Sequence, residues 1–145
     1  MSCGESMKIV IIDGQGGKMG KSVIEQLKKR FPGLETYAIG TNSIATSAML
    51  KAGATYGATG ENPVIVNAQD ADIIIGPIGI VMANSLLGEI TPAMATAIGI
   101  SKAYKILIPV NRCNHYIVGC QNSTCLLYTS SEPDGSYNNQ LPYYP

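Results

Sequence analysis

The sequence predicts a single α/β domain with a doubly wound, mainly parallel sheet. Short β-branched runs alternate with segments of helical periodicity, and a glycine-rich turn follows the first run. Strands separated by helices in this way form right-handed βαβ units. The 145 residues are enough for one hydrophobic core and too few for two domains.

The first half contains two strand-helix pairs. Residues 8–12 are a β-branched run, which is typical of a buried strand. Apolar residues at helical spacing then predict a helix over residues 17–30, which Pro32 and Gly33 end. Residues 36–39 suit a second strand. Residues 43–52 suit a second helix, closed by Gly53.

The second half continues the alternation, with more alternatives. Residues 54–56 suit a short third strand, and residues 72–75 a buried fourth one. Asn62 and Pro63 predict a helix start, so residues 63–69 are expected to be helical, although Val64-Ile65-Val66 would also suit a strand.

The remaining elements follow the fourth strand. Thr91-Pro92 opens a helix to about residue 102, and residues 80–87 leave open whether another helix forms. Residues 105–108 suit a strand that ends at Pro109, and residues 116–118 suit a last one. The whole pattern is that of a Rossmann-like domain.

Composition excludes several function classes. Lys+Arg and Asp+Glu both number 10 and the net charge is +0, so we expect no nucleic-acid partner and no anionic membrane surface. No apolar run approaches the roughly 20 residues of a membrane span. The first residues lack the apolar core of a signal peptide, so a cytoplasmic location is the default. Only 14% of residues are charged, which favours a homodimer.

The cysteines do not indicate a metal site. Cys3, Cys113, Cys120 and Cys125 are scattered without a C-x-x-C pair, and His115 is the only histidine. A structural zinc site needs four ligands at tight spacings. We therefore expect no metal. Neither His115 nor Cys113 has a catalytic partner that the sequence places beside it, so the catalytic residues are unknown.

The glycine loop "DGQGGKMGKS" after the first strand is the main functional signal. It satisfies G-x-G-x-x-x-G through Gly14, Gly16 and Gly20, and G-x-x-G-x-M-G through Gly14, Gly17 and Gly20. Such glycines turn the chain, let a pyrophosphate touch bare backbone, and allow close packing of helix and sheet. The following helix N-terminus presents free N–H groups to a phosphate.

A second interpretation of the same stretch is a P-loop, G-x-x-x-x-G-K-[ST]. Gly20-Lys21-Ser22 fits its end, but Gln15 stands where the first glycine belongs. The strand at residues 72–75 also lacks a magnesium-binding carboxylate at its C-terminal end. A degenerate nucleoside-triphosphate binder therefore stays only an alternative.

Ligands of open α/β sheets bind beyond the C-terminal ends of the strands. The residues expected there form the candidate cofactor-binding set: Asp13, Gly14, Gln15, Gly16, Gly17, Lys18, Met19, Gly20, Gly40, Thr41, Asn42, Ser43, Gly76, Pro77, Ile78, Gly79 and Asn111.

Two features of this set restrict the ligand. The Asp13 carboxylate would repel a pyrophosphate unless it bonds a ribose hydroxyl or a lysine. Gly40 to Ser43 lack the acid that binds the ribose of NAD, and their hydroxyl and amide groups could accept a 2′-phosphate. We therefore expect NADP or another phosphate-bearing nucleotide. The alternative is a structural or interaction domain whose glycines serve packing only.

Two resemblances to known families rest on quoted stretches of the sequence. The run "GQGGKMG" is similar to the NADP-binding loop of dihydrodipicolinate reductase. From residue 7 to about residue 121, stretches such as "GTNSIATSAMLKAGA", "DADIIIGPIGI" and "ILIPVNRC" resemble a short bacterial family known only as a conserved domain of unknown function. That resemblance implies a small Rossmann-like protein with no assigned activity. It also implies a final acidic helix after "YIVG", for which this sequence has no pattern.

The ends differ in composition from residues 7–123, the predicted nucleotide-binding domain. Residues 1–6 are expected to be a non-native or flexible leader. Residues 124–145 are expected to be a disordered, non-native tail, because "TCLLYTS" looks like the translation of a transposon end used in sequencing libraries. A genuine flexible tail is the alternative.

Overall fold

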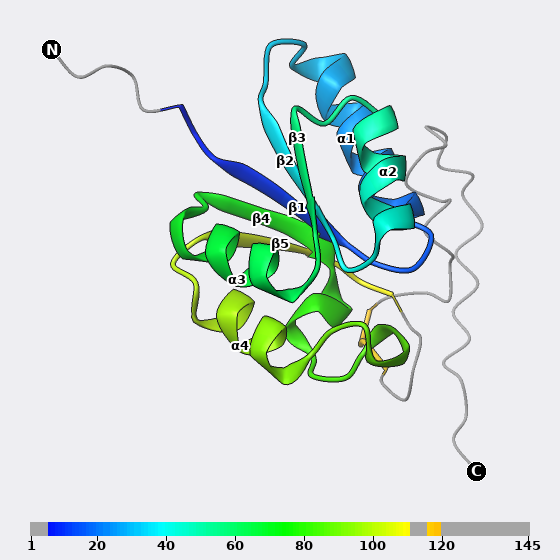
Figure 1. Cartoon of the computed structure of the whole chain (residues 1–145), viewed down its shortest axis with the longest axis vertical. Helices are drawn as coiled ribbons and strands as arrows, with labels where there is room; N and C mark the ends of the chain where they lie inside the picture. Colours follow the sequence, from blue (N-terminus) through cyan, green and yellow to red (C-terminus); the bar gives the residue numbers. More distant parts are fainter. Residues whose placement is uncertain (1–5, 111–115, 120–145) are drawn as a thin grey trace, which may run out of the picture.

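The computed structural model describes residues 6–110 and 116–119, and in them a five-stranded, all-parallel sheet lies between two layers of helices (Figure 1). The predicted α/β, Rossmann-like doubly wound fold is confirmed. The elements are β1 (Ile9–Asp13), α1 (Lys18–Arg30), β2 (Thr36–Gly40), α2 (Ser43–Lys51), β3 (Tyr56–Thr59), α3 (Glu61–Asp70), β4 (Ile73–Pro77), η1 (Ile78–Val81), η2 (Leu86–Gly88), α4 (Pro92–Ile100) and β5 (Tyr104–Ile108).

The strand order is β3-β2-β1-β4-β5. The chain moves outward from β1 through β2 to β3 and then crosses to β4 on the other side of β1, where Ile9 pairs with Ile73. The order therefore reverses between β1 and β4. In doubly wound sheets, this reversal opens a crevice beyond the carboxyl ends of the two strands, and ligands bind there.

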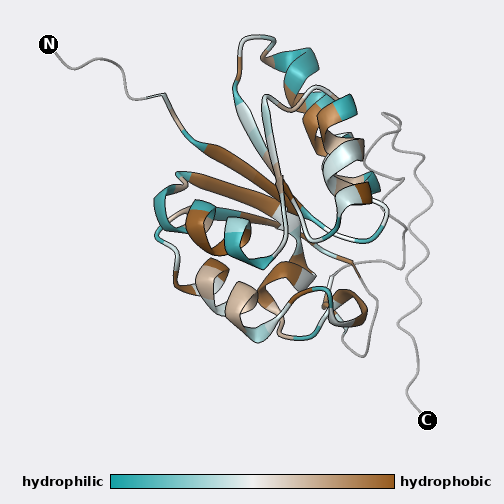
Figure 2. Ribbon diagram, in the orientation of Figure 1, coloured by the Kyte–Doolittle hydropathy of each residue, from teal (hydrophilic) through white to brown (hydrophobic). Residues whose placement is uncertain are grey.

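The central strands β1 and β4 are buried on both faces of the sheet, which explains why they are continuous apolar runs (Figure 2). Val10 and Ile12 of β1 pack in one core with α3 and α4. Ile9 and Ile11 alternate to the opposite face and pack with Ile24 of α1 and Met49 of α2. The two faces thus use alternate residues of the same strand.

Local signals in the sequence start the helices. Asn42 caps α2 by accepting a hydrogen bond from the Ala45 N–H at 2.9 Å. Thr91 caps α4 in the same way through the Met94 N–H at 3.2 Å, and Pro92 occupies the first helical position. α1 begins differently, after Gly17 in a left-handed conformation with no side-chain cap.

Two predicted boundaries were wrong. The third strand is Tyr56–Thr59 rather than residues 54–56, because the N–H groups of Gly53 and Ala54 bond back to carbonyls of α2 and complete its end. α3 begins at Glu61 after Gly60, not at Pro63. Pro63 lies in the first turn, where an N–H group has no helical partner to lose.

Residues 80–87, where the sequence left a helix open, and the predicted strand at residues 116–118 do not form regular elements. Residues 80–87 do not form one helix, because Leu86 and Leu87 have left-handed backbone conformations and only short 3₁₀ turns result. Residues 116–118 do not form a strand: Val118 lies in a turn with Gly119, whose φ is 82°.

β5 is an edge strand, and no helix among the described residues covers one apolar face of it. Tyr104 and Ile106 are 73% and 43% exposed, on the side from which Ile108 packs toward the α1–α2 core. Neither helix of that layer extends over this end of β5 (Figure 1). Throughout residues 6–110 and 116–119, the helices are too short or too polar to span a membrane.

Candidate functional site

The site lies where several strand-to-helix connections meet at the carboxyl edge of the sheet. The β1–α1 loop, the β2–α2 turn and the long connection from β4 to α4 all leave the sheet at this end (Figure 1). The Thr41 N–H donates to the Asp13 carbonyl at 3.0 Å and so joins the first two connections directly.

The Asp13 carboxylate holds the glycine loop from the inside. It is 5% exposed and accepts hydrogen bonds from the N–H groups of Gly14 at 2.8 Å and Gly20 at 2.7 Å. Burial raises the pKa of this carboxyl, the backbone hydrogen bonds oppose the rise, and the nearby charge of Glu89 adds to it. Asp13 therefore binds its own loop, with its carboxylate turned inward.

Two glycines of the loop stand where the structure has no room for a side chain. Gly17 has a φ of 70°, and a Cβ there would stand 2.7 Å from Cα of Ala45 in α2. A Cβ at Gly14 would stand 2.7 Å from Oγ1 of Thr41 and 2.9 Å from Cδ1 of Leu86. These two positions need glycine for packing and backbone conformation.

Gly16 differs from its neighbours. It is exposed, and a Cβ there would meet only Cγ of Lys18, at 4.0 Å. Within the described residues, no packing contact requires glycine at this position, and its backbone faces solvent.

Glu89, which the sequence did not single out, brings a second carboxylate to the loop. Its oxygens accept the Gln15 N–H at 3.0 and 3.2 Å. Its Oε1 also accepts the Thr41 hydroxyl at 2.9 Å and the Asn42 side-chain amide at 2.5 Å. Glu89 thus ties the β4–α4 connection to both the glycine loop and the end of β2.

A strained connection positions Glu89. Asn84, Leu86 and Leu87 have φ values of 63°, 53° and 56°, which are uncommon for residues other than glycine. The Asn84 N–H donates to the Ile90 carbonyl at 2.7 Å, and the Ser85 hydroxyl donates to the Gly79 carbonyl. Backbone strain of this kind persists when the surroundings hold it, and it clusters at functional sites.

The predicted set is only partly brought together. Asp13 to Gly20 form the glycine loop and its two ends, and Gly40 to Ser43 lie beside it. Lys18 and Ser43 are exposed. Gly76, Pro77 and Gly79 are buried, and a Cβ at Gly76 would strike the Ile12 carbonyl, so this glycine serves strand packing.

Several predicted residues lie outside the part of the chain that the structure describes. These are Asn111 of the candidate set, and Cys113 and His115. Among the described residues, no group of three or more His, Cys, Asp or Glu side chains could hold a metal ion.

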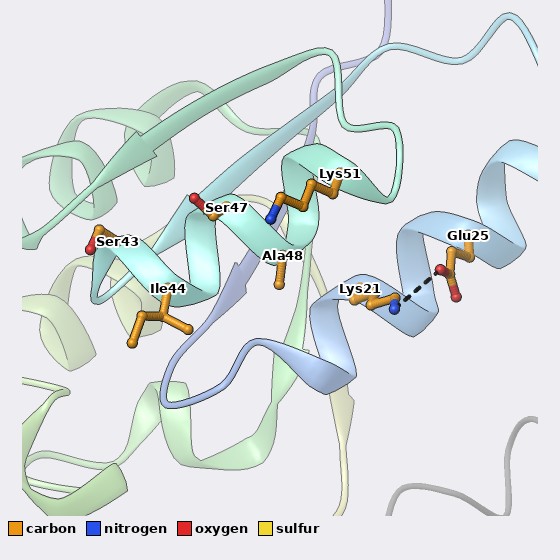
Figure 3. Close-up of a pocket in the computed structure, with 7 residues that line it drawn as sticks. All are labelled: Lys21, Glu25, Ser43, Ile44, Ser47, Ala48 and Lys51. Atoms are coloured by element: carbon orange, nitrogen blue, oxygen red, sulfur yellow. Dashed lines mark ion pairs between the residues drawn. The ribbon is translucent and has the colours of Figure 1, made fainter.

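A surface hollow of about 510 Å³ lies between α1 and α2 and shares Ser43 with the predicted set (Figure 3). Its lining residues are Lys21, Glu25, Ser43, Ile44, Ser47, Ala48 and Lys51. Lys21 stands one turn into α1 and pairs with Glu25 at 3.9 Å along the helix surface. A P-loop lysine would instead reach toward the phosphates at the loop.

Fold and loop together define a small doubly wound α/β domain with a glycine loop at its central strand. The chain belongs to the family described as a domain of unknown function, DUF3842, which matches residues 8–130. The predicted membership of a conserved family of unknown function is thus confirmed. The comparison with curated proteins found no match, and the comparison with solved structures found none either.

Proposed function

We propose that the domain binds a phosphate-bearing nucleotide at the loop from Gly14 to Gly20. One observation carries the proposal: the loop follows the central strand β1 at the point where the strand order reverses. Ligands of doubly wound sheets bind in this crevice, with phosphate at the following helix N-terminus.

The donors at the loop are consistent with this role. Gly20 gives its N–H to Asp13 and Gln15 gives its N–H to Glu89. The N–H groups of Gly16 and Lys18 donate no hydrogen bond within the described residues. They lie at the start of the 13-residue helix α1, where the helix dipole also favours an anion.

The inward position of Asp13 removes one objection to the proposal. A carboxylate at the end of β1 was expected to repel a pyrophosphate, but the two oxygens of Asp13 accept hydrogen bonds from the N–H groups of Gly14 and Gly20. The exposed Lys18 is the nearest cation in sequence to the free N–H groups. The proposal covers binding alone and assigns no catalytic residue.

The test is a thermal-shift and calorimetric panel on the full chain with NADP, NAD, ADP, ATP with and without magnesium, and inorganic phosphate. A ligand at a hundred times its Kd should stabilise the fold by about 2.7 kcal/mol. A shift with ATP that requires magnesium would instead favour the P-loop alternative, against which the position of Lys21 argues.

Gly16→Leu is the matched binding variant. Its side chain has open space in the free protein, so the fold should survive while the approach of a phosphate is blocked. Gly33→Leu is the control, because Gly33 is also an exposed glycine with nothing near its Cβ position. Gly17→Leu is unsuitable, since its side chain would strike the backbone of α2. Equal binding by both variants would overturn the proposed site.

The uncovered face of β5 favours a second candidate, an interaction domain with a vestigial loop. Tyr104 and Ile106 are both exposed, and as residues i and i+2 of an edge strand they lie on the same face. A folded chain that binds no probe and forms a homodimer, and that loses the dimer with Tyr104→Ser and Ile106→Ser together, would support this candidate. Light scattering after size-exclusion chromatography measures that outcome. The homodimer and the cytoplasmic location stay predictions from composition.

A further inference from the structure

We infer that Glu89 recognises the ribose of the bound nucleotide and makes the site selective for a free 2′-hydroxyl over a 2′-phosphate. This inference rests on the proposed function and adds to it a residue and a ligand class. It replaces the NADP expected from the sequence with a nucleotide of the NAD or ADP type.

The position of Glu89 is the first argument. Dinucleotide-binding sheets place a carboxylate beside the end of the second strand, where it binds the ribose hydroxyls. This chain has Gly40, Thr41 and Asn42 there, without an acid. Glu89 supplies the missing carboxylate from the β4–α4 connection, and it is bonded to Thr41 and Asn42 themselves.

The distribution of hydrogen bonds on the carboxylate is the second argument. Oε1 accepts Gln15, Thr41 and Asn42. Within the described residues, Oε2 accepts only the Gln15 N–H, at 3.0 Å, and shares that donor with Oε1. A carboxylate oxygen has two lone pairs, so Oε2 keeps capacity for a hydroxyl donor. Glu89 is half-buried, so part of its surface is exposed to solvent.

The division of the loop's donors is the third argument. Glu89 uses the N–H of Gln15, one residue before the free N–H of Gly16. The carboxylate therefore leaves the start of α1 open to a phosphate and stands on the side toward β2. This is the arrangement in which a nucleotide places its phosphate on the helix and its ribose at the strand end.

The negative charge of Glu89 disfavours a 2′-phosphate at the ribose position. Glu89 carries a negative charge at the ribose position, and the buried Asp13 lies near enough to be affected by it. The residues Gly40 to Ser43 include no lysine or arginine to offset a phosphate. A 2′-phosphate at the Glu89 carboxylate would bring like charges together in a partly buried site, which is strongly unfavourable.

The test measures binding by calorimetry on the full chain with ADP, 2′-deoxy-ADP and adenosine 2′,5′-bisphosphate. The wild type should bind ADP about tenfold more tightly than the deoxy analogue, the effect expected for one hydrogen bond to a charged acceptor. Glu89→Ala should remove this preference. Glu89→Gln, which keeps the shape and loses the charge, should improve binding of the bisphosphate relative to ADP.

Glu35→Gln, at an exposed site before β2, is the control and should leave all three affinities unchanged. An unchanged ratio of ADP to deoxy-ADP in Glu89→Ala would overturn the inference and leave the proposed function intact. Tighter binding of inorganic phosphate and of every nucleotide by Glu89→Ala would also overturn it, because Glu89 would then be a competitor for the phosphate position. No binding of any probe to the wild type would instead refute the proposed function and the inference together.

Discussion

Asp13 and Glu89 are two carboxylates at the same edge of the sheet, and they are held in opposite ways. Asp13 is almost fully buried and bonds only the backbone of its own loop. Glu89 is half-buried, lies 74 residues after Gln15, and accepts hydrogen bonds from main-chain and side-chain donors of two other segments. The first is a structural part of the loop, and the second is the residue that we propose for recognition of a ligand.

The largest effect should come from Asp13→Ala, which tests the structural role. The change leaves the buried N–H groups of Gly14 and Gly20 without their acceptor. Each unsatisfied buried donor costs about 1–3 kcal/mol, so we expect a loss of roughly 3 kcal/mol in the free energy of unfolding. Urea denaturation measures it. A loss no greater than that of an exposed control such as Glu35→Ala would contradict the comparison.

Glu89→Ala should have a smaller effect on the fold. Its partners Gln15, Thr41 and Asn42 are exposed or half-buried, so water can replace the carboxylate. We expect a loss of about 1 kcal/mol in the same denaturation experiment. If the loss equalled that of Asp13→Ala, Glu89 would be as structural as Asp13, and its role toward a ligand would lose its basis.

The smallest effect should be a pH dependence that belongs to Asp13. Burial raises the pKa of this carboxyl in the folded chain above the ordinary 3.8 that it has in the unfolded chain. At a pH between the unfolded pKa and the folded pKa, the folded chain therefore binds more protons than the unfolded chain. The free energy of unfolding should then fall as pH rises through this interval and level off above it.

Urea denaturation of the wild type and of Asp13→Asn over a pH series isolates this contribution. The stability of the wild type relative to the variant should decrease from acid toward neutral pH. An advantage of the wild type that grows with pH would show that the hydrogen bonds from Gly14 and Gly20 outweigh burial and hold the pKa below its usual range.

The fold was predictable because its signals are local. The apolar run of β1, the periodicity of α1, and the caps at Asn42 and Thr91 each act within a few residues of their own position. The wrong boundaries arose where a neighbouring element decided the outcome. Gly53 closes α2 as predicted, but residue 54 also finishes α2 rather than starts β3, because its N–H group bonds back to Met49.

The candidate site was predictable only in its first half. The glycine pattern marks the loop after β1, but it cannot separate Gly16, which faces solvent, from Gly17, which packs on α2. Glu89 gave no signal, because its neighbours have no periodicity and its partners lie 47 to 74 residues away in sequence. A contact over such a separation depends on the order of the strands, which local patterns do not contain.

The central place of β1 also has a consequence during protein synthesis. One edge of β1 can pair with β2 as soon as residue 40 is available, but its other edge must wait for β4 and residues 73–77. Until then, an apolar strand has one open edge, a state prone to pairing with other chains. Residues 41 to 72, which include two helices and one strand, therefore set how long the nascent chain stays exposed.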